Sequence, residues 1–192
     1  MKLPEHLFFT GVPGSHWSAI AQDIETIPGF NTSDHSDQRE YSPGTYTGHK
    51  GAYFGESMEF KSFLNLSHIN AAWKETGGTK IVKSHEWAYK LPLIKQLCPD
   101  AWIMLVYRPD LASNAWWHEA GGFKIKYPNY DSYKDSTTML SEITRQNQAI
   151  LDFGCVSDAK WSHYSTQWLQ DTFECDAVAK KQKSDILVTV IK

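Results

Sequence analysis

A glycine-containing loop between an apolar run and an amphipathic segment constrains the fold of this 192-residue chain more than any other feature. Residues 7–10, Leu-Phe-Phe-Thr, form a short apolar run that predicts a buried strand. The loop at residues 11–18 follows. Residues 19–25 then carry apolar side chains at helical spacing, and Pro28 and Gly29 end the pattern. The order strand, glycine loop, helix is typical of the first half of a βαβ unit.

The same alternation continues along the chain. Residues 101–107 are almost continuously apolar, which predicts a central parallel strand, and residues 80–84 and 186–191 are further strand candidates. Alternating strands and helices predict an α/β fold: a parallel sheet with helices on both faces, in a three-layer α/β/α, P-loop nucleotide-binding-like arrangement. Since no repeat or linker divides it, we expect residues 1–192 to form a single domain. Helical patterns occupy residues 57–75 (one or two helices), 91–97, 111–120, 138–153 and 168–173, and long loops are expected at 31–56 and 123–133.

Composition narrows the possible partners and compartment. A net charge of −3 and a pI near 6.2 argue against nucleic acid as the main partner. No apolar run approaches the roughly 20 residues that span a bilayer, so no membrane association is expected. Cys98, Cys155 and Cys175 lie far apart and show no metal-ligand spacing, which predicts reduced thiols and no zinc. The N-terminus lacks the pattern of a signal peptide, so together with the reduced thiols it predicts a cytoplasmic protein. We also expect no bound metal, because the cysteines lack metal-ligand spacing.

The loop itself has the properties of a phosphate site. Glycines allow backbone N–H groups to approach a ligand closely, and the following helix adds unpaired N–H groups and the positive end of its dipole. A tight strand-to-helix turn without a ligand would use the same residues. The predicted phosphate-binding residues are Gly11, Pro13, Gly14, Ser15, His16, Trp17 and Ser18.

This loop differs from the loop of ATP-hydrolysing proteins. The pattern Gly-x-x-x-x-Gly-Lys-Ser/Thr is met at Gly11 and Ser18 but broken by His16 and Trp17. The missing lysine would normally neutralise the outer phosphates during phosphoryl transfer. A kinase with a degenerate loop is therefore only an alternative hypothesis.

Two further groups of polar residues follow predicted strands. Lys83 and His85 lie at the end of the second strand, and Arg108 follows the third, with Ser113 in the helix after it. Because the carboxyl ends of parallel strands share one edge of a sheet, we expect these residues to meet the loop there.

In this order, the segments resemble the motifs of the sulfotransferase family. The first motif of that family is a strand followed by a Pro-Lys/Arg-Ser-Gly-Thr-like loop, which Pro13 and Ser15 match. A later Lys-Thr/Ser-His motif at a strand end is matched by residues 83–85, Lys-Ser-His. A third motif, a strand ending in Arg with a Ser in the next helix, is similar to Arg108 and Ser113. The resemblance covers roughly residues 5–120.

The sequence also departs from the family pattern. Gly14 replaces the basic residue of the loop, and His16 replaces its usual glycine. Arg108 and Ser113 are five positions apart, which is closer than in the family. No Arg-Lys-Gly motif occurs near the C-terminus, where the chain instead has Lys180, Lys181 and Lys183.

The resemblance implies a reaction and roles for these residues. The donor would be 3′-phosphoadenosine 5′-phosphosulfate, leaving adenosine 3′,5′-bisphosphate, with Arg108 and Ser113 on the 3′-phosphate. His85 would be the base that deprotonates a small-molecule or carbohydrate acceptor, and Lys83 and His16 would stabilise the leaving group. A binding module that keeps the pocket without turnover is the other alternative. Aromatic residues that either contact the acceptor or belong to the core are Tyr41, Tyr46, His49, Tyr53, Phe54, Trp116, Trp117, His118 and Phe123.

Overall fold

The chain forms an open, mostly parallel sheet with helices, a mixed α/β fold. The computed structural model describes residues 2–34, 52–54, 64–124, 134–180 and 182–192. Among these residues the sheet has five strands in the order β2-β1-β3-β5-β4. The strands are β1 His6–Gly11, β2 Lys80–Lys83, β3 Trp102–Tyr107, β4 Ser162–His163 and β5 Leu187–Ile191.

Three of the predicted strands are parallel, and β1 lies between β2 and β3. β1 pairs in parallel with β2 through Phe9 and Lys83, and with β3 through Phe9 and Met104. The prediction that the whole sheet is parallel is wrong, because β5 runs antiparallel to both β3 and β4. Tyr164 directly follows β4, and its N–H donates at 3.1 Å to the carbonyl of Ile186, which directly precedes β5. β5 therefore begins next to the end of β4. An apolar pattern predicts a strand but carries no information on its direction.

The predicted helices are present in the described residues. They are α1 Trp17–Ile24, α2 Leu66–Asn70, α3 Leu91–Leu97, α4 Asp110–Glu119, α5 Ser136–Val156 and α6 Thr166–Phe173, with 3₁₀ turns η1 His85–Tyr89 and η2 Gly122–Lys124. The Asp135 side chain caps α5 by accepting from the Thr138 N–H at 2.8 Å. Most of the two predicted long loops, and the start of the helical pattern at 57–75, lie outside the described residues. No helix in the described residues is long and apolar enough to cross a membrane.

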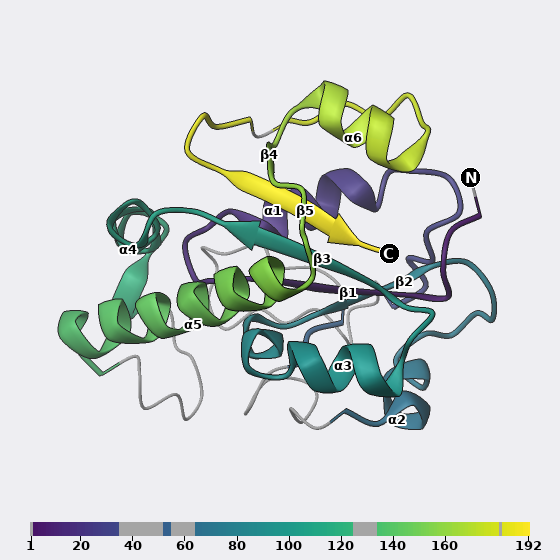
Figure 1. Cartoon of the computed structure of the whole chain (residues 1–192), viewed down its shortest axis with the longest axis horizontal. Coiled ribbons are helices and arrows are strands. Elements are labelled where there is room, and N and C mark those ends of the chain that lie inside the picture. Colours follow the sequence, from purple (N-terminus) through teal and green to yellow (C-terminus); the bar gives the residue numbers. More distant parts are fainter. Residues whose placement is uncertain (1, 35–51, 55–63, 125–133, 181) are drawn as a thin grey trace.

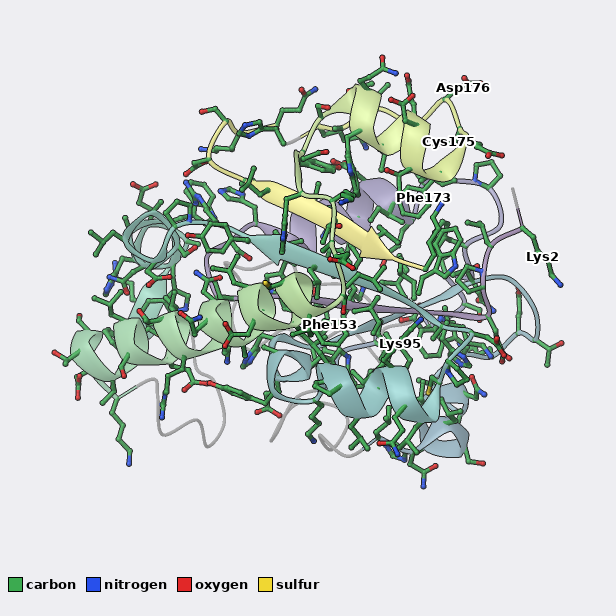
Figure 2. All side chains as sticks on the ribbon, in the orientation of Figure 1. Lys2, Lys95, Phe153, Phe173, Cys175 and Asp176 are labelled. Atoms are coloured by element: carbon green, nitrogen blue, oxygen red, sulfur yellow. The ribbon has the colours of Figure 1, made fainter. Side chains whose placement is uncertain are left out.

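The two faces of the sheet carry separate apolar clusters, because side chains alternate along each strand. Phe9 belongs to the cluster with α1 and α6, whereas Phe8 belongs to the cluster with α2, α3 and α5. Figure 1 shows α6 above the sheet and α3 and α5 below it. Phe173 of α6 and Phe153 of α5 mark these opposite faces in Figure 2. Helices therefore cover both faces, and the carboxyl ends of β1, β2 and β3 share one edge.

Candidate functional site at the carboxyl edge of the sheet

The loop at residues 11–18 joins the end of β1 to the start of α1, as the sequence predicts. The Ser15 N–H donates to the Val12 carbonyl at 3.0 Å. His16 has a left-handed backbone (φ 64°), and its carbonyl accepts from the N–H groups of Ala19 and Ile20 at 3.0 and 3.1 Å. The N–H groups in the first turn of a helix have no acceptor within the helix, and here they belong to Trp17 and Ser18. The loop thus presents helix donors beside a strand end.

Gly14 brings this loop into direct contact with α4. Its φ is +81°, and a Cβ atom here would lie 1.9 Å from the carbonyl oxygen of Ser113 and 3.1 Å from Cβ of Trp117. No side chain fits without moving the backbone of one segment. The basic residue that the family resemblance would place at this position is therefore excluded by the packing of the loop on α4.

Ser15 is a buried loop residue whose hydroxyl makes no hydrogen bond within the described residues. Its hydroxyl is fully buried, and Oγ has no hydrogen-bond partner among the described residues. It packs over Gly11, where an added Cβ would lie 2.8 Å from Ser15 Oγ and 2.7 Å from Trp17 Cβ. A buried hydroxyl without a partner costs free energy. A phosphate oxygen or a water at the loop would remove that cost.

The two aromatic residues of the loop have different environments. Trp17 is a core residue, stacked on Phe9 with ring centroids 5.9 Å apart. His16 instead stacks on Trp116 of α4 at 4.2 Å, and Lys183 Nζ lies 5.1 Å from the centre of the Trp116 ring. Lys183, from the segment before β5, therefore reaches the α4 side of the loop. Lys181 lies outside the described residues.

Arg108 connects the loop to the segment that precedes β5. Its Nε donates to Asp185 Oδ2 at 2.7 Å and its Nη1 donates to the Gly14 carbonyl at 3.1 Å. Ser113 Oγ, also buried, donates to the Arg108 carbonyl at 3.2 Å. Arg108 and Ser113 do converge on the loop as predicted. The guanidinium, however, is already bound to the Asp185 carboxylate and to a loop carbonyl. Nothing in the sequence indicated that Asp185 would be its partner.

Lys83 and His85 contact helices on opposite faces of the sheet. Lys83 Nζ forms a buried ion pair with Glu25 Oε1 at 2.6 Å and lies 5.1 Å from the centre of the Tyr53 ring, on the α1 face. His85 contacts α5 on the other face, where its Nδ1 lies 3.0 Å from Nε2 of Gln146. The structure therefore does not bring the two predicted catalytic side chains into one group.

His85 belongs to a polar cluster where η1 packs against α5. Gln146 Nε2 also donates to Glu142 Oε1 at 2.8 Å, and the same carboxylate oxygen accepts from the Tyr89 hydroxyl at 2.7 Å. Burial lowers the pKa of His85 to about 4, although the negative charge of Glu142 and the Gln146 hydrogen bond oppose this shift. The Thr10 hydroxyl donates to the His85 carbonyl at 3.3 Å and so joins this cluster to the end of β1. At neutral pH the imidazole is uncharged.

Two residues of α5 were missed as site residues. Gln146 and Asn147 are both buried, and Asn147 Nδ2 donates to the Arg108 carbonyl at 2.8 Å and to Asp110 Oδ1 at 2.6 Å. Gln146 Oε1 and Asn147 Oδ1 are buried without a partner in the described part of the chain. The signal that marks them is a pair of amides within the apolar stripe of residues 138–153.

The aromatic candidates for acceptor contact separate into core residues and partly exposed residues. Tyr53, Phe54 and Trp117 are buried in the core, whereas Phe123 is 44% exposed. Tyr41, Tyr46 and His49 lie outside the described residues. Within the described ranges, no group of three or more His, Cys, Asp or Glu side chains could hold a metal ion.

No protein-family model, curated protein or solved structure matches the chain. A proposal for the function therefore has to be based on the residues and contacts described above.

Proposed function

We propose that the chain binds 3′-phosphoadenosine 5′-phosphosulfate at the loop of residues 11–18 and transfers its sulfuryl group to a hydroxyl or amine of a small-molecule or sugar acceptor. The proposal includes a three-layer, P-loop nucleotide-binding-like domain over residues 1–192 and a cytoplasmic location. It includes no metal, no nucleic acid and no membrane partner.

The observation that carries the proposal is the buried Ser15 hydroxyl, which has no partner in the part of the chain that the structure describes and lies between the end of β1 and the start of α1. A helix N-terminus attracts anions because its first N–H groups lack acceptors. Ser15 adds a donor that is already desolvated, and a hydrogen bond from such a donor to an anion is worth about 1.5–3 kcal/mol. Trp17 and Gly14 serve this site through their backbone alone, since one is core and the other has no side chain.

In the proposed reaction, the acceptor oxygen or nitrogen attacks sulfur, and the bond from sulfur to the bridging phosphate oxygen breaks. The acceptor proton passes to His85, and the bisphosphate leaves with the bond's electron pair. Burial has two effects on this role: it keeps the imidazole unprotonated at neutral pH, and a pKa of about 4 makes it a weaker base than a histidine that titrates near neutral pH. The Lys83 pairing with Glu25 is less favourable, because that ammonium would have to exchange partners before it could stabilise the leaving group.

A second candidate is a binding module that holds the bisphosphate nucleotide without turnover. Three contacts favour it. Gly14 leaves no room for a basic side chain, the Arg108 guanidinium is bound to Asp185, and Lys83 is bound to Glu25. These contacts leave the Ser15 hydroxyl and the N–H groups at the start of α1 as donors for a phosphate.

The two candidates, and the kinase alternative, differ in a thermal-shift and transfer experiment. Adenosine 3′,5′-bisphosphate should raise the melting temperature. Ser15→Ala should weaken its binding about 10–100-fold, in line with the loss of one charge-assisted hydrogen bond. Ser162→Ala on the exposed strand β4 is the matched control and should bind normally. Gly11→Val is unsuitable as a binding variant, because its Cβ would press on Trp17 and Val106.

Transfer of labelled sulfate from the donor to a panel of sugars, phenols and amines is then measured. His85→Ala should lower the rate about 10²–10⁴-fold while bisphosphate binding remains. Binding of the bisphosphate without transfer to any acceptor would support the silent module. A magnesium-dependent response to ATP alone would support the kinase, and no response to the bisphosphate would refute the proposed function.

A further inference from the structure

We propose that Gln146 fixes His85 in the tautomer that carries its proton on Nε2, and that Glu142 holds Gln146 in the orientation that does so. Gln146 and Glu142 then control whether His85 can act as the base in the reaction proposed above. The catalytic meaning of this inference depends on the proposed function, but the tautomer itself is a property of the fold.

The Gln146 amide nitrogen contacts both His85 and Glu142. Gln146 Nε2 lies 3.0 Å from His85 Nδ1 and 2.8 Å from Glu142 Oε1. An amide nitrogen has two hydrogens and accepts no hydrogen bond, so both neighbours must be acceptors. Nδ1 is therefore unprotonated, and the single ring proton of the neutral imidazole lies on Nε2.

Glu142 determines which way round the Gln146 amide lies. If the Gln146 amide were turned over, its oxygen would lie beside Glu142 Oε1, and two acceptors would face each other in a partly buried site. Glu142 cannot easily move away, because its Oε1 also accepts from the Tyr89 hydroxyl at 2.7 Å and its Oε2 accepts from Arg145 Nη2 at 2.6 Å. The carboxylate therefore selects the orientation, even though this leaves Gln146 Oε1 buried without a partner among the described residues.

The position of the ring proton determines which proton transfers His85 can make. With its proton on Nε2, the ring offers a hydrogen-bond donor at Nε2, not a base. To accept a proton at Nε2, the ring must first carry its own proton on Nδ1. The Gln146 amide would have to turn so that its free oxygen accepts from Nδ1. The polar cluster between η1 and α5 thus holds His85 in a donor form until the hold of Glu142 on Gln146 is released.

Nitrogen-15 NMR of the histidine rings tests this directly, in the full chain without any nucleotide. The His85 signals are assigned by their loss in His85→Gln. In the unmodified chain at neutral pH, Nδ1 of His85 should resonate in the unprotonated range and Nε2 in the protonated range. In Glu142→Gln, an isosteric change that removes the charge, both nitrogens should shift toward intermediate values as the second tautomer becomes populated. In Gln146→Glu, the new carboxylate beside Nδ1 can only accept, so the proton should move to Nδ1.

Asp152→Asn is the control, because it neutralises an exposed carboxylate on the same helix whose partner is Gln148. It should leave the His85 signals unchanged. A proton on Nδ1 of His85 in the unmodified chain would overturn the proposal, and so would unshifted signals in a folded Glu142→Gln. If Gln146→Glu fails to fold, the unmodified chain and Glu142→Gln still decide the question. The thermal-shift result with bisphosphate is independent, so failure of the proposed function can be distinguished from failure of this inference.

Discussion

The loop at residues 11–18 and the polar cluster of His85, Gln146 and Glu142 lie at the same edge of the sheet but are built differently. Backbone geometry builds the loop: a left-handed glycine, a helix start and a carbonyl of α4 in direct contact. Side chains build the cluster, and His85 and Gln146 are 61 positions apart. The loop should therefore be most sensitive to added atoms, and the cluster to changes in charge and protonation.

The largest expected effect tests the loop. Gly14→Ala would force a left-handed backbone on a residue with a side chain and would place Cβ 1.9 Å from the Ser113 carbonyl oxygen. Strain of this kind costs about 1–3 kcal/mol, and overpacking typically adds a further 1–3 kcal/mol. We expect the free energy of unfolding, measured by urea denaturation, to fall by about 4 kcal/mol.

Gly77→Ala separates the two causes. Gly77 has a similar φ of +88°, but no atom lies within 4 Å of an added Cβ. Only the left-handed backbone is penalised there, which should cost about 1–2 kcal/mol. Equal losses in the two variants would show that the loop does not pack on α4 as described.

The next effect tests the cluster through pH. Burial lowers the pKa of His85 from 6.5 to about 4. As the pH falls below 6.5 the unfolded chain takes up a proton at this residue, whereas the folded chain does not until about pH 4, so stability rises with pH across this window. At 1.36 kcal/mol per pKa unit, acidification from pH 7 to pH 4 should remove about 3 kcal/mol of stability through His85 alone.

His85→Gln should lack this contribution, so its unfolding free energy should depend less steeply on pH between about 6.5 and 4 than that of the unmodified chain. Denaturant titrations at several pH values measure the difference, which also cancels the contribution of carboxylates common to both proteins. Parallel curves would mean that His85 titrates normally and is not buried in the cluster.

The sequence predicted the loop but not the cluster, because only the loop is built from residues that are close together in the sequence. Glycine, proline and an apolar run carry local information, so residues 11–18 could be placed between β1 and α1 in advance. The partners of His85, Lys83 and Arg108 come from α5, α1 and the segment before β5, and nothing near these residues in the sequence names Gln146, Glu25 or Asp185. Strand direction was also inaccessible, since the apolar run of β5 is compatible with either orientation.

The smallest effect has opposite signs at two serines. Ser15 and Ser113 are both fully buried, but Ser113 Oγ donates to the Arg108 carbonyl whereas Ser15 Oγ has no partner in the described residues. Ser113→Ala should lower the free energy of unfolding by about 1 kcal/mol, the usual net value of a hydrogen bond. Ser15→Ala removes an unsatisfied hydroxyl and should raise the free energy of unfolding by up to about 1 kcal/mol in the absence of ligand.

The sign at Ser15 should reverse when the site is filled. Adenosine 3′,5′-bisphosphate in excess stabilises the folded chain by RT ln(1 + L/Kd), where L is the concentration of free bisphosphate, and Ser15→Ala raises Kd, so the unmodified chain should become the more stable protein. Urea denaturation with and without the bisphosphate measures both states. If Ser15→Ala destabilised the ligand-free chain as much as Ser113→Ala, the Ser15 hydroxyl would already be satisfied within the fold. The loop would then be a strand-to-helix turn whose serine is structural, and the strongest single argument for an anion at this edge would be lost.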